Sequence, residues 1–335
     1  MSSKAVHSAQ AVPDGTIIRN AVMLACRAPS LHNSQPWRWV ADGSVLHLFA
    51  DPSRMMLAAD STGREVILSC GAVLDHLQVA MAAAGVDSAV ERFPDPHDPD
   101  HLAELRFTPS ETVTDEQRRR ADAILLRRTD RLPFAEPPDW VKLETALRQS
   151  VIPHHLMFDI VLDEDRPELA RASQLTETLR HYDPSYQAEL EWWTAPVEFD
   201  AGVPDSARVS ASEANRVDVA RSFPPAGGGD RRADIGFDRS KIVVLSTLHE
   251  DARRDVLRCG EALSAVLLEA TMAGMATCTL THMIELAPSR EIVRKLIGQT
   301  GLPQLLIRIG LRPQGEPDVP ATPRRPLTDV LELRG

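Results

Sequence analysis

Two segments of the chain have similar sequences. The first is Ile67-Leu68-Ser69-Cys70-Gly71-Ala72-Val73-Leu74, followed by Ala84-Gly85. The second is Val256-Leu257-Arg258-Cys259-Gly260-Glu261-Ala262-Leu263, followed by Ala273-Gly274. Leu, Cys-Gly, Leu and Ala-Gly keep their order, and residues 71 and 260, like residues 85 and 274, are 189 positions apart. A segment that is apolar on nearly all sides predicts a helix at the centre of a domain. The final glycine of each segment stands where a left-handed helix cap is expected.

Strand-like runs flank both segments at matching places. They are residues 45–50 and 86–90 around the first helix, and residues 241–246 and 276–280 around the second. Two buried helices can share Leu, Ala and Gly by chance, but the matched flanks favour a true repeat. The length of 335 residues also suits roughly two domains of about 150 residues. We therefore expect one α+β unit used twice, with a first half over residues 1–115 and a second over 116–335.

The composition excludes some classes of partner. Lys and Arg are outnumbered 37 to 48 by Asp and Glu, and the formal net charge of -11 argues against a nucleic-acid partner. The four cysteines, at positions 26, 70, 259 and 278, show no metal-ligand or CxxC spacing, which indicates buried reduced thiols. No signal-peptide pattern and no run of about 18 apolar residues is evident, so we expect a cytoplasmic protein with no membrane partner.

A polar block lies ahead of the first repeat, in the run Ala28-Pro29-Ser30-Leu31-His32-Asn33-Ser34-Gln35-Pro36-Trp37-Arg38-Trp39. Its side-chain donors and acceptors, which suit the edge and tail of a flat polar heterocycle such as a flavin, are those of Ser30, Asn33, Ser34 and Gln35. The two prolines stiffen the backbone between them. A surface turn would also contain Ser, Asn and Pro, but it leaves the two tryptophans unexplained.

A cationic block follows a helix expected over residues 115–126, in the run Arg127-Arg128-Thr129-Asp130-Arg131-Leu132-Pro133-Phe134. Guanidinium groups match phosphate oxygens in a bidentate way, and the threonine hydroxyl adds a neutral donor. The alternative is a solvated basic helix end. A further basic fragment, Pro323-Arg324-Arg325-Pro326-Leu327, lies near the end of the chain.

These blocks carry a family resemblance. The run 28–39 resembles the flavin-contacting Pro-Ser-x-x-Asn-x-Gln-Pro-Trp motif of the nitroreductase superfamily, and the run 127–134 is similar to the Arg-x-Ser-x-Arg/Lys-x-Phe motif that opens a nitroreductase domain. The combination resembles the Acg-type branch most, whose long chains look like two nitroreductase domains in tandem. The resemblance implies an intramolecular pseudo-dimer of two nitroreductase-like domains.

The same resemblance implies FMN as the cofactor and assigns residues to it. Arg127, Thr129 and Arg131 inherit contacts to the phosphate and ribityl chain, and Arg128 a place beside the flavin ring. In the C-terminal fragment Arg325 matches the family's basic tail best, while Arg324 is offset by one position. Because each block occurs once, we expect one FMN per chain, held through its phosphate by the second half and enclosed by the polar block of the first.

Three functions remain open at this stage. The first is two-electron reduction of nitroaromatic or quinone acceptors with NAD(P)H, in which the flavin supplies the hydride chemistry and no catalytic side chain is assigned. The second is FMN sequestration without turnover, and the third is a flavin enzyme with a specific metabolite. We expect a monomeric pseudo-dimer, with further self-association left open.

An insertion over about residues 179–234 interrupts the second half. Its aromatic residues, set among turn residues, are Trp192, Trp193, Phe199 and Phe223. Both a lid over the site and a dimer-contact arm explain such a segment. No metal site is expected, because the acidic run 95–101 is interrupted by prolines and His154-His155 has no companion at metal-ligand spacing. Gly227 to Gly229 lacks the Lys-Ser/Thr of a P-loop.

Overall fold

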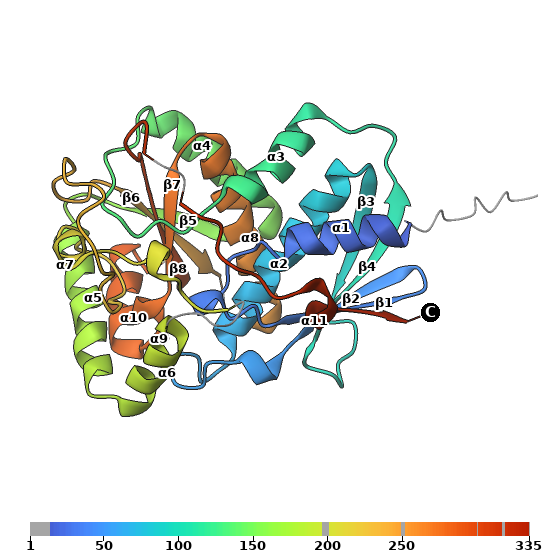
Figure 1. The fold of residues 1–335 in the computed structure, drawn as a ribbon, viewed down its shortest axis with the longest axis horizontal. Coiled ribbons are helices and arrows are strands. Elements are labelled where there is room, and N and C mark those ends of the chain that lie inside the picture. Colours follow the sequence, from blue (N-terminus) through green and yellow to red (C-terminus); the bar gives the residue numbers. More distant parts are fainter. Residues whose placement is uncertain (1–13, 196–200, 249–251, 300, 317–318, 335) are drawn as a thin grey trace, which may run out of the picture.

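Two β-sheets lie on either side of a central pair of long helices, α2 (Arg64–Ala83) and α8 (Arg253–Met272), in a computed structural model of the chain (Figure 1). The structure describes residues 14–195, 201–248, 252–299, 301–316 and 319–334. Phe199 of the expected insertion lies outside the described residues.

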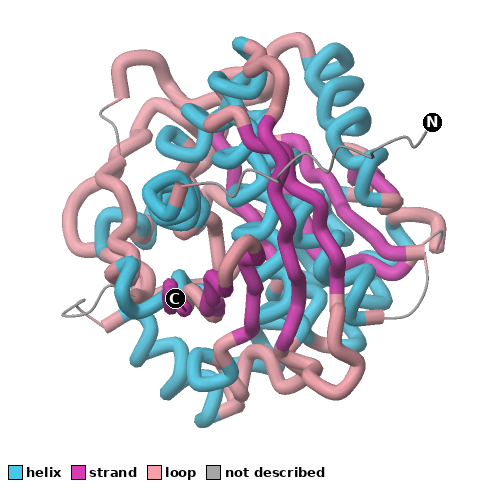
Figure 2. The backbone as a smooth tube through the Cα atoms, turned by 90° about the vertical axis from the view of Figure 1, so that its right-hand side faces the viewer, coloured by secondary structure: helices cyan, strands magenta, loops and turns pink. Residues whose placement is uncertain are grey.

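The first sheet belongs mainly to the first half. Its strands are β1 (Trp37–Asp42), β2 (Val45–Ala50), β3 (Val86–Arg92), β4 (His101–Pro109) and β9 (Leu331–Arg334). They are ordered β3-β4-β2-β1-β9, and all pairs are antiparallel except β1 with β9. Figure 2 shows strands of this sheet side by side, with helices around them.

The second sheet repeats this topology. Its strands are β5 (Met157–Val161), β6 (Lys241–Thr247), β7 (Ala276–Leu280) and β8 (Leu302–Gly310). The order β7-β8-β6-β5 equals the order β3-β4-β2-β1 of the first sheet, with α8 between β6 and β7 as α2 lies between β2 and β3. The expected α+β unit used twice is therefore confirmed.

The central helices meet at the two glycines of the repeat. A Cβ at Gly71 would lie 2.1 Å from the carbonyl oxygen of Leu257, and a Cβ at Gly260 would lie 2.0 Å from that of Leu68. Only glycine permits this approach, so the Cys-Gly pair of each segment is a packing requirement of the interface between the halves. Both helices also end before a left-handed glycine, Gly85 at φ +79° and Gly274 at φ +76°.

Helix α2 is long and apolar enough to cross a membrane by length and composition alone, contrary to our sequence-based reading that no such run exists. In the structure 83% of its apolar window is buried. It packs against α8 and the first sheet, in a hydrophobic core that both halves share. These are the surroundings of a core helix.

All four cysteines are buried, as the sequence analysis expected.

The end of the chain returns to the first half. After β8 the chain passes α11 (Leu327–Val330), and β9 then pairs in parallel with β1. The boundary proposed at residue 115 falls at the start of α3 (Asp115–Leu126), which a capping box of Thr114 and Gln117 begins. The C-terminal segment of the second half thus lies in the first sheet and interlocks the two halves.

The insertion is longer than the sequence suggests. β1 and β2 are separated by two residues, whereas β5 and β6 are separated by residues 162–240. The expected start at residue 179 lies inside α5 (Arg166–His181), whose regular helical pattern gave no sign that it was part of an insertion. The segment also contains α6 (Pro184–Thr194) and α7 (Ala211–Ala214).

The remaining helices are short or peripheral. They are α1 (Gly15–Ala25), α4 (Trp140–Val151), α9 (His282–Glu285), α10 (Ala287–Leu296) and the 3-10 turns Leu31–Asn33, Pro52–Arg54, Ile152–His154 and Asp205–Ala207. His154 is the last residue of the third of these turns, and His155 caps it two residues before β5.

Candidate functional site

A cavity of about 760 Å³ opens between the two halves. The first half contributes the loop after α1 and the first turns of α2. The second half contributes the loop after α3, the end of β7, and the insertion through α5 and residues 209–223. This volume lies in the upper part of the range of about 300–1,000 Å³ for small-molecule pockets. We call it the larger cavity.

A smaller cavity of about 60 Å³ adjoins it. Pro29, Ser30, Thr129 and Arg131 line both cavities, so the two are neighbouring compartments of one site. The smaller cavity is strongly cationic. Its arginines are Arg27, Arg127, Arg128, Arg131 and Arg324.

Four of these arginines lack the usual compensating acids in the described part of the chain. Among the described residues Arg27, Arg127, Arg131 and Arg324 form no ion pair. Burial, then Arg128 and Arg27, lowers the pKa of Arg127 to about 10. Burial and the neighbouring arginines also hold the pKa of Arg324 well below its usual range. Because a buried charge without a counter-charge is costly, the cluster calls for an anion.

Backbone carbonyls hold the guanidinium groups in place without neutralising them. Arg324 donates from Nε to the carbonyl of Cys26 at 2.8 Å and from Nη2 to that of Arg27 at 3.1 Å. Arg127 donates from Nη2 to the same Arg27 carbonyl at 3.0 Å. These acceptors lie at the C-terminal end of α1, where carbonyls have no helical partner. The Nε of Arg127 is buried without a partner in the described part of the chain.

The polar block contributes to the same wall. Ser30 and Asn33 line the smaller cavity together with Arg127, Arg128 and Thr129, so the structure brings the two sequence blocks together. Asn33 also donates to the carbonyl of Pro323 at 3.2 Å, which links it to the C-terminal tail.

Three expected contact residues lie elsewhere: Ser34, Gln35 and Arg325 line neither cavity. The amide oxygen of Gln35 accepts the backbone N–H of Arg325 at 2.9 Å, and Arg325 pairs with Asp51 at 3.4 Å. These contacts fasten the tail to the polar block. The structure thus gives Gln35 and Arg325 a role in shaping the site.

Arg128 also departs from its expected position. It lines the smaller cavity and not the larger one, although the resemblance implies a place beside a flavin ring. Its Nη1 donates to the carbonyl of Leu125 at 2.7 Å, at the end of α3. This geometry puts its charge among the other arginines.

His32 is a site residue that sequence reasoning missed. It is only 6% exposed, lines the larger cavity, and has a left-handed backbone with φ 47°. Burial, then Arg221 and Arg131, holds its pKa well below 6.5, so the ring is neutral. Its Nδ1 is buried without a partner among the described residues. Its position inside the polar block was the available signal.

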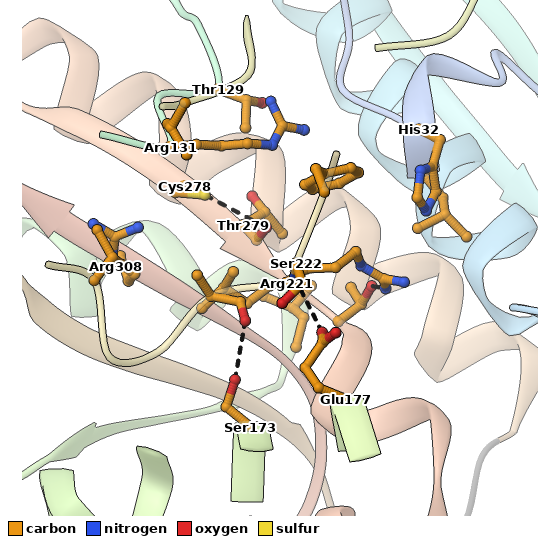
Figure 3. Close-up of a pocket in the computed structure, with 18 of the residues that line it drawn as sticks. His32, Thr129, Arg131, Ser173, Glu177, Arg221, Ser222, Cys278, Thr279 and Arg308 are labelled. Atoms are coloured by element: carbon orange, nitrogen blue, oxygen red, sulfur yellow. Dashed lines mark hydrogen bonds between the residues drawn. The ribbon is translucent and has the colours of Figure 1, made fainter. Parts of the chain in front are cut away.

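Charged side chains line the larger cavity as well (Figure 3). Arg221 pairs with Glu285, and Arg308 pairs with Asp238 at 2.7 Å. Glu65 pairs with Arg64, and burial raises the pKa of its carboxyl to about 7. No sequence motif marks these residues, which come together only through the packing of α2, β7, β8 and the insertion.

The insertion covers the larger cavity and is fastened to the first half. Glu189 accepts the backbone N–H groups of Ala58 and Ala59 at 3.1 and 2.9 Å, and Arg180 donates to the carbonyl of Ala58 at 2.9 Å. Trp193 is buried at this contact, whereas Trp192 is 64% exposed. The insertion therefore has the position of a lid.

The fold and site define an α+β protein of two interlocked repeats with an anion-seeking site between them. No protein-family model matches the chain. It is 58% identical over 318 residues to a Mycobacterium tuberculosis protein named "Putative NAD(P)H nitroreductase acg", covering 95% of this chain and 96% of that one. Another protein of that organism, named "Putative NAD(P)H nitroreductase Rv3131", is 38% identical and covers 96% and 92%. The chain belongs to the Acg family of nitroreductase-like proteins.

Solved structures give more distant similarities. An FMN and NADPH-dependent nitroreductase NfnB from Sphigopyxis sp. strain HMH aligns at a TM-score of 0.43 with 15% identity, covering 64% of this chain and 99% of that one. A nitroreductase-like protein from Anabaena variabilis aligns at a TM-score of 0.47 with 10% identity, covering 88% and 73%.

Proposed function

We propose that the protein binds one FMN per chain and reduces nitroaromatic or quinone acceptors with electrons from NAD(P)H. The observation that carries the proposal is a group of four arginines, Arg27, Arg127, Arg131 and Arg324, that form no ion pair within the described part of the chain and lie at one end of a cavity shared by both halves. A phosphate monoester carries close to two negative charges at neutral pH. Its binding would supply a counter-charge to the four arginines that have none among the described residues.

Particular residues fit the phosphate end. Arg127 and Arg324 are oriented by the carbonyls at the end of α1, and the buried Nε of Arg127 has no partner among the residues that the structure describes. Thr129 and Asn33 add neutral donors on the same wall. Charge-assisted hydrogen bonds of this kind are shorter and stronger than neutral ones.

The larger cavity fits a planar ring. Its apolar walls include Leu68 of α2, Leu263 of α8 and Cys278 of β7. The larger cavity joins the smaller one at Ser30 and Thr129. A bound flavin supplies hydride and electron transfer chemistry. The chain's own residues position the ring, and the insertion excludes water.

The names of the relatives support the reductase reading. The acg and Rv3131 proteins are both named as NAD(P)H nitroreductases. The comparison covers nearly the whole of each chain, so it includes both halves of the site.

Sequestration of FMN without turnover is the second candidate. The insertion supplies Arg221, Ser222 and Phe223 to the larger cavity, and its anchors at Ala58 and Ala59 hold it against the first half. A lid that stayed closed would keep both the electron donor and the acceptor out.

Oxidation of NADH and NADPH by the FMN-loaded protein, measured with and without a nitroaromatic or a quinone, tests the reductase. We expect bound flavin at a one-to-one ratio and an oxidation rate that rises with the acceptor. Full flavin content with no acceptor-dependent rate would favour sequestration. Absence of flavin binding would refute both candidates.

A further inference from the structure

Among the described residues, Glu177 is the carboxylate of the larger cavity that forms no ion pair, although the charge of Arg221 acts on it from a longer range. It lies on α5 of the insertion, half-buried in the wall of the cavity. One of its oxygens accepts the backbone N–H of Ser222 at 3.0 Å. That contact fixes the direction of the carboxylate but supplies no positive charge.

The other carboxylates of the lining are neutralised. Glu65 pairs with Arg64, and Asp218 pairs with Arg166 at 2.8 Å. Arg221, the cation nearest in sequence to Ser222, is itself paired with Glu285. Glu177 forms no ion pair among the described residues, and the longer-range charge of Arg221 is shared with Glu285, so the carboxylate can accept a cationic ligand.

Glu177 lies away from the phosphate end of the site. In Figure 3 its carboxylate lies on the opposite side of the cavity from Thr129 and Arg131, which mark the passage to the arginine cluster. The anionic end of a ligand held by those arginines through its phosphate would therefore lie away from Glu177.

An aromatic pair lines the same cavity. The ring of Phe223 stands edge-on to that of His32 at a centroid distance of 5.5 Å, and Phe223 follows Ser222 directly. Aromatic side chains of this kind pack well against a planar ligand. The cavity thus offers ring contacts and a negative charge.

We propose that Glu177 selects electron acceptors that are planar aromatics with a positively charged nitrogen substituent, over neutral and anionic analogues. Deprotonated Glu177 would accept a charge-assisted hydrogen bond from the substituent. Burial raises the pKa of this carboxyl, and a bound cation would hold it in the ionised form. This inference rests on the proposed function, because it concerns the second ligand of that site.

Binding of three matched nitroaromatics tests the inference. They are 4-nitrobenzylamine, which is cationic at neutral pH, 4-nitrobenzyl alcohol and 4-nitrobenzoate, each titrated into the FMN-loaded protein by calorimetry. We expect the amine to bind about tenfold more tightly than the alcohol, which corresponds to one partly buried charge pair, and the benzoate to bind most weakly. Glu177→Gln should bring the amine and the alcohol to equal affinity.

Asp218→Asn is the matched control, because it removes a lining carboxylate that already has a partner. It should keep the preference for the amine, and the flavin content of both variants should match that of the unmodified protein. An unchanged preference in Glu177→Gln, or an equal loss in Asp218→Asn, would overturn the role of Glu177. The same titrations into the protein without FMN separate the two proposals, because a chain that binds the amine selectively but no FMN would refute the proposed function alone.

Discussion

Asp75 and Ser264 occupy equivalent positions in the two repeats, 189 residues apart, and are hydrogen-bonded to each other. The Ser264 hydroxyl donates to the Asp75 carboxylate where α2 crosses α8, and both side chains are buried. Equivalent residues meet in this way only near an axis that relates the two halves. The repeat that the sequence shows as an offset is therefore a physical interface.

This contact predicts a pH-dependent stability. Burial raises the pKa of Asp75 from 3.8 to about 6, so the folded protein binds more protons than the unfolded chain between about pH 4 and 6. The free energy of unfolding should fall as pH rises through this interval, by on the order of 3 kcal/mol from this group. Denaturant unfolding at pH 4 to 8 measures it. Asp75→Asn should be less sensitive to pH, and curves of equal slope would contradict the assignment.

Removing an arginine of the cluster should weaken FMN binding but raise the stability of the protein without FMN. Arg127→Met should weaken FMN binding by about 1.5–3 kcal/mol, or roughly 10- to 150-fold in Kd, because a charged contact to phosphate is lost. The same change should stabilise the protein without ligand, since it removes a buried cation that has no acidic partner within the described ranges of the chain.

Flavin titration and thermal unfolding with and without FMN measure these two effects. Arg118→Ala, an exposed residue of α3 paired with Asp115, is the control and should change neither. Undiminished flavin affinity in Arg127→Met would refute the phosphate contact.

Asn33 predicts a spectroscopic effect. Its side chain faces the smaller cavity and also holds the carbonyl of Pro323. Asn33→Ala should shift the absorbance of bound flavin and weaken its retention while circular dichroism stays unchanged, because one polar contact is lost and the tail bearing Arg324 is loosened. Ser53→Ala, in an exposed turn, should leave the spectrum as it is. Identical spectra for Asn33→Ala would show that this side chain does not reach the ligand.

The glycine contact between the halves predicts a large loss of stability. Gly71→Ala places a methyl group 2.1 Å from the Leu257 carbonyl oxygen, so α2 and α8 must separate. We expect a loss on the order of 3 kcal/mol or more in the free energy of unfolding, as for overpacked cores. Gly227→Ala meets no atom within 4 Å and should be nearly neutral. Equal stability of the two variants would be inconsistent with the close approach of the helices.

Local pattern was sufficient for much of the fold. The helix expected at residues 115–126 and the strand expected at 276–280 match α3 and β7. Periodicity and capping act within a few residues of each other, so a linear reading detects them. The insertion escaped such a reading, because α5 has the pattern of any surface helix and only the pairing of β5 with β6 shows what it interrupts.

The site divides in the same way. Guanidinium groups and small polar side chains in the sequence indicated an anion site. The sequence did not indicate which of these side chains face that site. Gln35 and Arg325 bind each other, whereas Glu177 lines the larger cavity without any motif to mark it, and His32 had only its position inside the polar block.

Residue type and spacing along the chain thus established the repeat, its central helices and the chemistry of the two polar blocks. The return of β9 to the first sheet and the crossing of α2 over α8 decided which side chains share a cavity. The physical reason is that the contacts joining Arg324 to Cys26, or Gln35 to Arg325, link residues almost three hundred positions apart. Such contacts form only when the packed core brings both ends of the chain to one place.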